Sequence, residues 1–301
     1  MDVIATVVAA SGLSDETVSA IAGAVDLLAI EAHSFKWIDR GFAGDFSLTV
    51  HDNDLVRVRQ AFDQAIAQIG VMVDVIVQRT ADRAKRLLIA DMDSTMITVE
   101  CIDELADYAG IKAQIAAITE RAMRGELDFR AALTERVALL AGLPETVIAQ
   151  CLAERVRPMA GARTLVQTLD ARGVRCVLVS GGFTCFADPV AAMLGFRRTV
   201  ANVLEIADGV LTGRVIGPIV DSGTKLATLN AECAALNIGA DQVLAIGDGA
   251  NDIAMIAAAG LGIAYHGHPA AIAAADAAVQ YGDHRTILWA LGIPSGQWAT
   301  A

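Results

Sequence analysis

Short uninterrupted hydrophobic runs divide the chain from about residue 87 onward, and such runs are typical of strands buried in a parallel sheet. The three clearest are Leu87–Ala90, Val174–Val179 and Val243–Ile246. Helical periodicity separates them, so the pattern predicts an α/β fold with a doubly wound, mostly parallel sheet. The weaker predicted elements are a hairpin of 203–206 and 210–216, strands at 262–265 and 277–280, and helices at 163–172, 184–194, 226–236, 253–258, 269–278 and after about 282.

Residues 100 to about 155 interrupt this alternation with helical spacing and little strand pattern. Their hydrophobic residues form two stripes, Ile102, Leu105, Ala106 and Ala109, then Phe129, Leu133, Val137 and Leu140. The block ends near Pro158, after which strands and helices alternate again. It is therefore predicted to be an inserted helical cap, at about 100–157, over the strand ends of a unit spanning 85–301. Such lids exclude water and admit substrate.

The first 80 residues alternate differently and predict a small α+β unit of their own. Strands are expected at Val3–Ala10, Ser34–Ile38, Asp45–His51 and Val71–Val77, and helices at Asp15–Leu28 and Asp54–Ile69. The order β-α-β-β-α-β is that of a ferredoxin-like sandwich. The charged run 79–86 marks the expected boundary between the domains 1–80 and 85–301.

Composition and charge restrict the classes of partner. The 301 residues are 54% hydrophobic and carry a formal net charge of −12, so we expect a folded protein without a nucleic-acid partner. Five scattered cysteines without C-x-x-C spacing and an N-terminus without a basic flank indicate a cytoplasmic protein. The uncharged segment Ile253–Ala275 is long, but glycines and Pro269 interrupt it, so a membrane span is not expected.

Carboxylates follow two of the three main strands. Asp91 and Asp93 come directly after Leu87–Ala90, and Asp248 and Asp252 follow Val243–Ile246. Alternation along a strand places Asp91 and Asp93 on one face, where two close negative charges require a shared proton or a cation. Oxygen ligands of this kind favour Mg²⁺. The spacing leaves open which aspartate would act as a nucleophile.

A hydroxyl, two glycines and a lysine supply the opposite chemistry. Ser180-Gly181-Gly182-Phe183 lies between a strand and a helix, where free N–H groups favour an anion, although a plain strand-to-helix turn has the same composition. Lys225 stands near the start of a predicted helix; it would be a surface charge or the cation for a phosphate. No G-x-x-x-x-G-K-[ST] loop occurs, and His266 and His268 are expected in a turn and not on a metal.

Taken in order, these segments resemble a known family. Asp91-Met92-Asp93-Ser94-Thr95, Ser180-Gly181-Gly182-Phe183, Lys225 and Gly247-Asp248-Gly249-Ala250-Asn251-Asp252 resemble the four motifs of the haloacid dehalogenase-like phosphatases, and within them the phosphoserine phosphatase family. The resemblance covers roughly residues 85–290. It implies Mg²⁺-dependent hydrolysis of O-phospho-L-serine, the last step of serine synthesis, through an aspartyl-phosphate.

The resemblance also implies a role for each matching residue. Asp91 would be the nucleophile and Asp93 the general acid and base, and Mg²⁺ would bind Asp91, the main-chain carbonyl of Asp93 and Asp248. The phosphoryl group would be held by Ser180, Gly181, Gly182, Lys225 and Asn251, with Asp252 in support. In the cap, Glu100 would bind the substrate ammonium and Arg136 its carboxylate, beside Met123 and Phe129. Without the resemblance, Glu100 and Arg136 would be taken for a helix-start charge and a surface ion pair.

Alternatives remain at two points. The catalytic unit could act on phosphothreonine or phosphohomoserine, or transfer phosphate to another alcohol; a binding protein with a vestigial site is the alternative of a different class. For residues 1–80, similar proteins carry an amino-acid-binding regulatory module. Here Ala10-Ser11-Gly12-Leu13-Ser14-Asp15 replaces the expected glycine- and proline-rich turn, so formation of a homodimer or simple stabilisation is an equal expectation.

Overall fold

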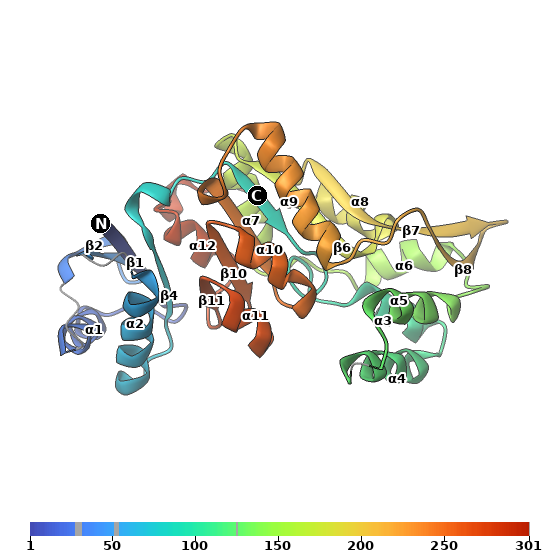
Figure 1. The fold of residues 1–301 in the computed structure, drawn as a ribbon, viewed down its shortest axis with the longest axis horizontal. Coiled ribbons are helices and arrows are strands. Elements are labelled where there is room, and N and C mark those ends of the chain that lie inside the picture. The colour runs from blue at the N-terminus through green and yellow to red at the C-terminus, as the bar shows by residue number, and fades with distance from the viewer. Residues whose placement is uncertain (28–31, 51–53, 125, 301) are drawn as a thin grey trace.

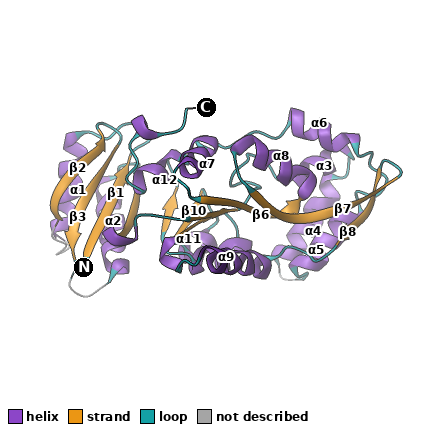
Figure 2. Cartoon of the chain, turned by 90° about the horizontal axis from the view of Figure 1, so that it is seen from above, coloured by secondary structure: helices purple, strands orange, loops and turns teal. Residues whose placement is uncertain are grey.

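The computed structural model describes residues 1–27, 32–50, 54–124 and 126–300, and contains two separate sheets (Figure 1). An antiparallel sheet with two helices lies at the N-terminal end, and a larger, mostly parallel sheet with helices on both faces forms the rest. Figure 2 shows the N-terminal strands as a group distinct from the main sheet, with the cap helices at the opposite end of the molecule. No helix in the described part of the chain is long and apolar enough to cross a membrane.

The N-terminal sheet has the strand order β2-β3-β1-β4, with every neighbouring pair antiparallel. Its elements are β1 (Asp2–Val8), α1 (Asp15–Leu27), β2 (Ala32–Asp39), β3 (Ala43–Thr49), α2 (Leu55–Ile69) and β4 (Asp74–Arg79). This is the ferredoxin-like arrangement that the pattern predicted. The last strand begins at Asp74 and not at Val71, because α2 ends in a left-handed Gly70 and the chain needs three residues to return to the sheet. The predicted ends at Leu28 and His51 lie outside the described residues.

The main sheet has the order β11-β10-β9-β5-β6-β7-β8, and its neighbouring strands are parallel except for the pair β7–β8. Its strands are β5 (Leu87–Ala90), β6 (Arg175–Phe183), β7 (Arg198–Ala207), β8 (Val210–Ile216), β9 (Val243–Gly247), β10 (Leu261–Tyr265) and β11 (Ala277–Val279). The central strand β5 lies between β6 and β9, so the carboxyl ends of the three predicted main strands meet at one edge. Ligands of open α/β sheets bind at this edge.

Helices bury both faces of the main sheet. Alternate residues of β5 divide between two cores: Leu88 packs with α7 (Ala162–Ala171), α8 (Thr184–Leu194) and α12 (Arg285–Ala290). Leu87 and Ile89 pack with α9 (Ser222–Leu236) and α10 (Ile253–Ala258), beside which lies α11 (Pro269–Ala274). The strand is thus buried on both faces, which explains why its sequence lacks polar alternation.

In the described residues the cap consists of four helices, α3 (Cys101–Tyr108), α4 (Lys112–Met123), α5 (Phe129–Ala138) and α6 (Thr146–Glu154). Ile102, Leu105 and Ala106 of the first predicted stripe and Leu133, Val137 and Leu140 of the second are buried. The β7–β8 hairpin binds the segment that follows α5. The amide of Gly142 donates to the carbonyl of Leu211, and the amide of Leu211 donates to the carbonyl of Leu143. The cap is therefore joined to the core by a strand pair as well as by its two chain connections.

Several segments of the main sheet differ from the sequence prediction in their extent. The strand predicted to end at Val179 continues to Phe183, so Ser180, Gly181 and Gly182 lie in the last part of β6 and not in a turn after it. The helix expected over 269–278 ends at Ala274, because Ala275 is extended and Ala277–Val279 completes the edge of the sheet. Strand β7 begins at Arg198, earlier than the predicted hairpin, because it first pairs in parallel with β6 and only then with β8. These differences come from pairing with distant strands, which an alanine-rich or mixed local sequence does not specify.

Two residues of the charged run 79–86, Arg83 and Lys85, have their side chains packed against other parts of the chain, while most of the run is exposed. The run contains a short 3-10 helix, Thr80–Asp82. Arg83 donates two hydrogen bonds to Asp45, of 2.7 and 2.9 Å, and others to the carbonyls of Trp289 and Ala290. Lys85 is 7% exposed, with Nζ 2.7 Å from the carbonyl of Asp241. The contacts of Arg83 fix the N-terminal sheet against the core.

Candidate active site

The loop after β5 holds the two aspartates that the sequence singled out. Asp91 is 5% exposed, and its amide donates to the carbonyl of Ile246 in β9, which extends the sheet by one residue. The chain then turns sharply, with Ser94 in the left-handed region at φ 54°. The carboxylate of Asp93 accepts a hydrogen bond from the amide of Cys101 at 3.2 Å. Both side chains line one cavity of about 110 Å³.

Lys225 is buried beneath Asp91. Its helix begins at Ser222, with Asp221 as N-cap accepting from the amide of Thr224, so Lys225 faces inward from the first turn. Its Nζ lies 2.7 Å from Asp91 and 2.6 Å from Asp252, and its side chain is 1% exposed. Burial alone would lower the pKa of Lys225, but the two carboxylates outweigh it and raise the pKa above its ordinary value. The lysine is therefore a buried counter-ion of two carboxylates and not a surface charge.

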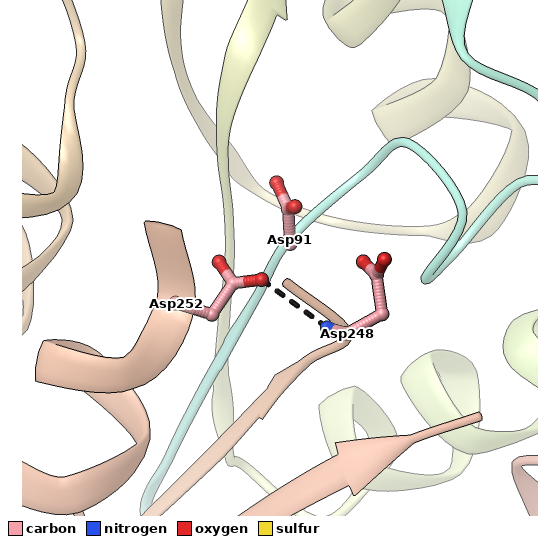
Figure 3. Close-up of side chains that lie close together, drawn as sticks. All are labelled: Asp91, Asp248 and Asp252. Carbon is pink, nitrogen blue, oxygen red and sulfur yellow. Dashed lines mark hydrogen bonds between the residues drawn. The ribbon is translucent and has the colours of Figure 1, made fainter. Parts of the chain in front are cut away.

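The turn after β9 places the second pair of carboxylates. Asp252 is fully buried: one oxygen accepts from Lys225, and the other from the amides of Asp248 and Gly249. Figure 3 shows the first of these amide bonds and the approach of Asp91, Asp248 and Asp252. The carboxylate of Asp248 accepts a 2.7 Å hydrogen bond from the hydroxyl of Thr95. Asp252 thus fixes the turn, while Asp248 faces Asp91.

The three carboxylates fit a divalent cation. Ligand oxygens of Asp91, Asp248 and Asp252 lie within 4.8 Å of one another. Burial raises the pKa of Asp91 well above its ordinary value, and the charges of Asp252 and Asp248 add to this despite Lys225. Because both oxygens of Asp252 are already engaged, Asp91 and Asp248 are the carboxylates that remain to bind a metal. An all-oxygen set of this kind suits Mg²⁺.

The predicted Ser-Gly-Gly segment lines the same cavity as the carboxylates. Ser180 is 1% exposed, and its hydroxyl accepts a 2.8 Å hydrogen bond from the amide of Gly182, so its own proton remains to be donated. A Cβ on Gly182 would lie 2.7 Å from Oδ2 of Asp93, and one on Gly181 would lie 3.0 Å from the ring of Phe129. Glycine at 182 therefore allows the close approach of the loop that carries Asp93, and a side chain at 181 would displace the ring of Phe129 from the cap.

Asp93 has the proton affinity of an acid–base group. Burial and the charge of Glu100 raise the pKa of Asp93 to about 7, while the hydrogen bonds from Cys101 oppose the rise. A carboxyl with this pKa exchanges protons readily near neutral pH. The pKa of Glu100 is also raised by burial, and Ser94 opposes this by donating a 2.6 Å hydrogen bond to its carboxylate.

The cap supplies charged side chains to the same cavity. Glu100, Phe129 and Arg136 line it together with Asp91, Ser180 and Asn251. Nε of Arg136 donates to the carbonyl of Ala132 at 3.3 Å, and no ion pair to this arginine occurs among the described residues. Burial lowers the pKa of Arg136, and Asp103 and Glu100 oppose this. Met123 ends α4, and its side chain lies outside the described part of the structure.

Most of the residues singled out from the sequence are thus brought together: Asp91, Asp93, Glu100, Phe129, Arg136, Ser180, Gly181, Gly182, Asp248 and Asn251 line the cavity. Lys225 and Asp252 lie behind it and not on its wall. The roles given to these residues stay predictions, because geometry alone does not test them.

Other residues of the site were given no role from the sequence. Thr95 and Ser94 directly follow the paired aspartates, and their hydroxyls bind Asp248 and Glu100. Arg130, in α5, donates two hydrogen bonds to the N-cap Asp221, of 2.6 and 3.0 Å, and so links the cap to the helix that carries Lys225. The hydroxyls of Ser94 and Thr95, next to the paired aspartates, could have indicated these hydrogen bonds from the sequence. The sequence around Arg130 does not indicate that Asp221 is its partner.

Comparison with known proteins agrees with this architecture. The family model of haloacid dehalogenase-like hydrolases matches residues 88–257. The chain is 48% identical over 227 residues to the phosphoserine phosphatase SerB2 of Mycobacterium tuberculosis, which covers 75% of this chain and 55% of that protein. It is 46% identical over 205 residues to the phosphoserine phosphatase of Idiomarina loihiensis, covering 68% of this chain and 93% of that one.

A solved structure extends the likeness to the N-terminal sheet. The structure of a probable phosphoserine phosphatase from Vibrio cholerae superimposes with a TM-score of 0.74 at 31% identity, over 96% of this chain and 87% of that chain. The chain belongs to the haloacid dehalogenase-like hydrolases. The curated relatives named above are phosphoserine phosphatases, and this chain spans little more than half of the length of the mycobacterial one.

Proposed function

We propose that the protein is a phosphatase that hydrolyses O-phospho-L-serine to L-serine and phosphate. The observation that carries the proposal is one cavity in which paired aspartates, a serine and two glycines face the cap residues Glu100 and Arg136. The first group has the chemistry to cleave a phosphate ester, and the second has complementary charges for an amino acid. The names of the curated relatives support the same substrate.

Asp91 is the proposed nucleophile. It stands at the carboxyl end of the central strand, held by the sheet through its amide and by the 2.7 Å ion pair to Lys225. This fixed position favours attack on phosphorus along one line, with formation of an aspartyl-phosphate and departure of the serine oxygen. Water then cleaves the aspartyl-phosphate and releases phosphate.

Asp93 is the proposed acid and base. With a pKa of about 7 it can donate a proton to the leaving serine oxygen and then accept one from the attacking water. The Ser180 hydroxyl, which is buried and fixed by Gly182, donates to a phosphoryl oxygen in both steps.

The proposed metal site consists of Asp91 and Asp248, with the main-chain carbonyl of Asp93. A bound Mg²⁺ would keep Asp91 ionised and neutralise charge on the phosphoryl oxygens. Lys225 and Asp252 act behind this site, where they hold Asp91 and the turn at Asp248.

Substrate recognition is assigned to the cap. Arg136 lacks an ion-pair partner in the described chain and can pair with the substrate carboxylate, while Glu100 can accept from its ammonium. Phe129 closes the cavity against Gly181. The role of Met123 follows from the resemblance alone.

Substrate analogues test the assignment. Phosphoethanolamine lacks the carboxylate of phosphoserine, so wild-type protein should prefer phosphoserine. In Arg136→Met the preference in kcat/KM should fall by about 10–100-fold, the value of one charged hydrogen-bonded contact. Arg130→Met, in which an exposed cap arginine is lost, serves as the matched control and should keep the preference. An unchanged preference in Arg136→Met would refute the role of Arg136 in substrate recognition. Higher activity on phosphothreonine or phosphohomoserine than on phosphoserine would show that the proposed substrate is wrong.

For the remaining assignments we propose a cytoplasmic enzyme with domains at 1–80 and 85–301 and a homodimer formed through the N-terminal sheet. Strand β2 lies at the edge of that sheet and is available for pairing. Sedimentation of the whole chain, compared with a variant carrying proline in place of Lys36 in β2, tests the dimer. A monomeric wild-type protein would exclude it.

A further inference from the structure

The buried carboxylate of Asp74 joins the N-terminal sheet to the C-terminal part of the core. Asp74, the first residue of β4, is 3% exposed. Its carboxylate accepts from the backbone amides of Gln280, Tyr281 and Gly282, at 2.8, 3.1 and 2.7 Å. A Cβ on Gly282 would lie 2.9 Å from Oδ2 of Asp74, so the close approach depends on the glycine. The segment 280–282 is therefore held by the other sheet.

The same segment leads directly to a buried histidine. His284 is fully buried, and its Nε2 lies 2.8 Å from the main-chain carbonyl of Thr95. Burial lowers the pKa of His284 to about 4, so the ring is neutral. A carbonyl can only accept, so Nε2 carries the proton and donates it. The ring stacks on Tyr265 at 3.9 Å with an angle of 7°, which fixes its plane.

Thr95 connects the histidine to the proposed metal site. Its carbonyl is held by His284, and its hydroxyl donates to Oδ1 of Asp248 at 2.7 Å. Its side chain is fully buried, between the loop after β5 and the turn after β9. A displacement of the Thr95 backbone would therefore move the hydrogen bond that orients Asp248.

We propose that His284 is a positioning residue for Asp248, acting through Thr95, and that Asp74 holds His284 in place, so that the N-terminal sheet contributes to the divalent-cation affinity of the site. The inference rests on the metal site of the proposed function. Mg²⁺ requires near-ideal ligand geometry, and partners that orient metal ligands typically contribute 10–100-fold in affinity. The N-terminal sheet then has a structural role in catalysis, separate from amino-acid sensing or dimerisation.

Two substitutions of His284 separate the hydrogen bond from the ring. His284→Gln keeps an N–H donor at about the position of Nε2 and loses the ring, whereas His284→Phe keeps the ring stacked on Tyr265 and loses the donor. We expect Mg²⁺ affinity, measured by titration calorimetry on the whole chain without substrate, to fall about 10–100-fold in His284→Phe and to stay within about threefold in His284→Gln. Thr95→Val should lower affinity similarly, and its combination with His284→Phe should add little more.

A matched pair tests the contribution of the N-terminal sheet. Asp74→Asn weakens the acceptor for the three amides, and we expect about fivefold weaker Mg²⁺ binding. Asp39→Asn alters another carboxylate of the same sheet that contacts the core, at Trp289 and Ser295 and not at 280–284. It should leave Mg²⁺ affinity unchanged. Thermal melts establish that each variant is folded.

The outcomes distinguish this inference from the proposed function. If the wild-type chain does not bind Mg²⁺, the metal site itself is wrong. If it binds Mg²⁺ and folded His284→Phe binds equally well, or if the effects of Thr95→Val and His284→Phe simply add, the relay through Thr95 is refuted. Should His284→Phe not fold, the comparison of Asp74→Asn with Asp39→Asn decides, and equal affinities would overturn the role of the N-terminal sheet.

Discussion

Removal of the buried lysine gives the most specific prediction about the energetics of the site. In Lys225→Met, the carboxylates of Asp91 and Asp252 lose a cation at 2.7 and 2.6 Å while remaining buried. Removing one partner of such a buried pair typically costs about 3–5 kcal/mol of unfolding free energy. At roughly 2–4 °C per kcal/mol, this corresponds to a fall in Tm of about 6–20 °C for the metal-free protein near pH 7.5.

The loss should depend on pH in a definite direction. The pKa of Asp91 is already raised by burial, and without Lys225 it would rise further. A carboxyl with a higher pKa in the folded state takes up a proton on folding, so the stability of the variant should improve as pH falls through the raised pKa. The difference in Tm from wild type should therefore shrink as the pH is lowered from about 7.5.

A second buried lysine provides the control. Lys85 donates to the carbonyl of Asp241 and has no carboxylate within ion-pair distance in the described chain. Lys85→Met should cost about 1.5–3 kcal/mol. This loss should change little below pH 7.5, because the pKa of Lys85, lowered mainly by burial, is about 8. Calorimetric melts of both variants with EDTA provide the comparison. If the fall in Tm of Lys225→Met stays constant or grows as pH falls, the instability of the variant does not come from unpaired, ionised Asp91 and Asp252, and the reasoning is refuted.

Further predictions concern the rest of the site. Because Asp93 has a pKa of about 7, kcat/KM should fall as pH rises through that value. Asp93→Asn should abolish this fall and lower the rate by about 10²–10⁴-fold. A fall with pH that persists in the variant would exclude Asp93 as the acid. Gly182→Ala should reduce kcat at least about tenfold, because its Cβ would displace Asp93. Gly23→Ala, whose Cβ meets open space, should keep the wild-type kcat. Equal activities of the two variants would contradict the close approach of Gly182 to Asp93. Arg130→Ala removes an exposed ion pair to Asp221 and should lower kcat/KM by no more than about fivefold. Adding 0.5 M salt, which screens the pair, should lower the kcat/KM of the wild-type protein by about the same factor. A larger loss in the variant would mean that the pair does more than hold the cap.

The parts of the fold that the sequence predicted well are those set by local pattern. Buried parallel strands are continuous apolar runs, so Leu87–Ala90 and Val243–Ile246 were located within a residue of their observed ends. The polar residues that follow them necessarily share one edge of the sheet. The cavity-lining carboxylates and the Ser-Gly-Gly segment could therefore be predicted before any side chain was placed.

Contacts between distant segments could not be predicted in this way. Lys225 was placed near a helix start, where either solvent or a phosphate would surround it; the structure surrounds it with Asp91 and Asp252. His284 and Thr95 are 189 residues apart and meet through a backbone carbonyl, which leaves no mark on residue type at position 95. The charged run 79–86 had the composition of a linker. Arg83 and Lys85 are nevertheless packed, because Asp45 of the N-terminal sheet and the carbonyls of Trp289 and Asp241 in the core accept their hydrogen bonds.

The most direct test of the account follows the phosphoryl group itself. Wild-type protein with Mg²⁺ is mixed with O-phospho-L-serine carrying radioactive phosphorus, quenched in acid within milliseconds, and assayed for labelled protein and released phosphate. The account predicts a label that hydroxylamine removes, as expected of an acyl phosphate, and that is absent from Asp91→Asn and from protein treated with EDTA. Release of phosphate by Asp91→Asn at the wild-type rate would contradict the assignment of Asp91 as the nucleophile.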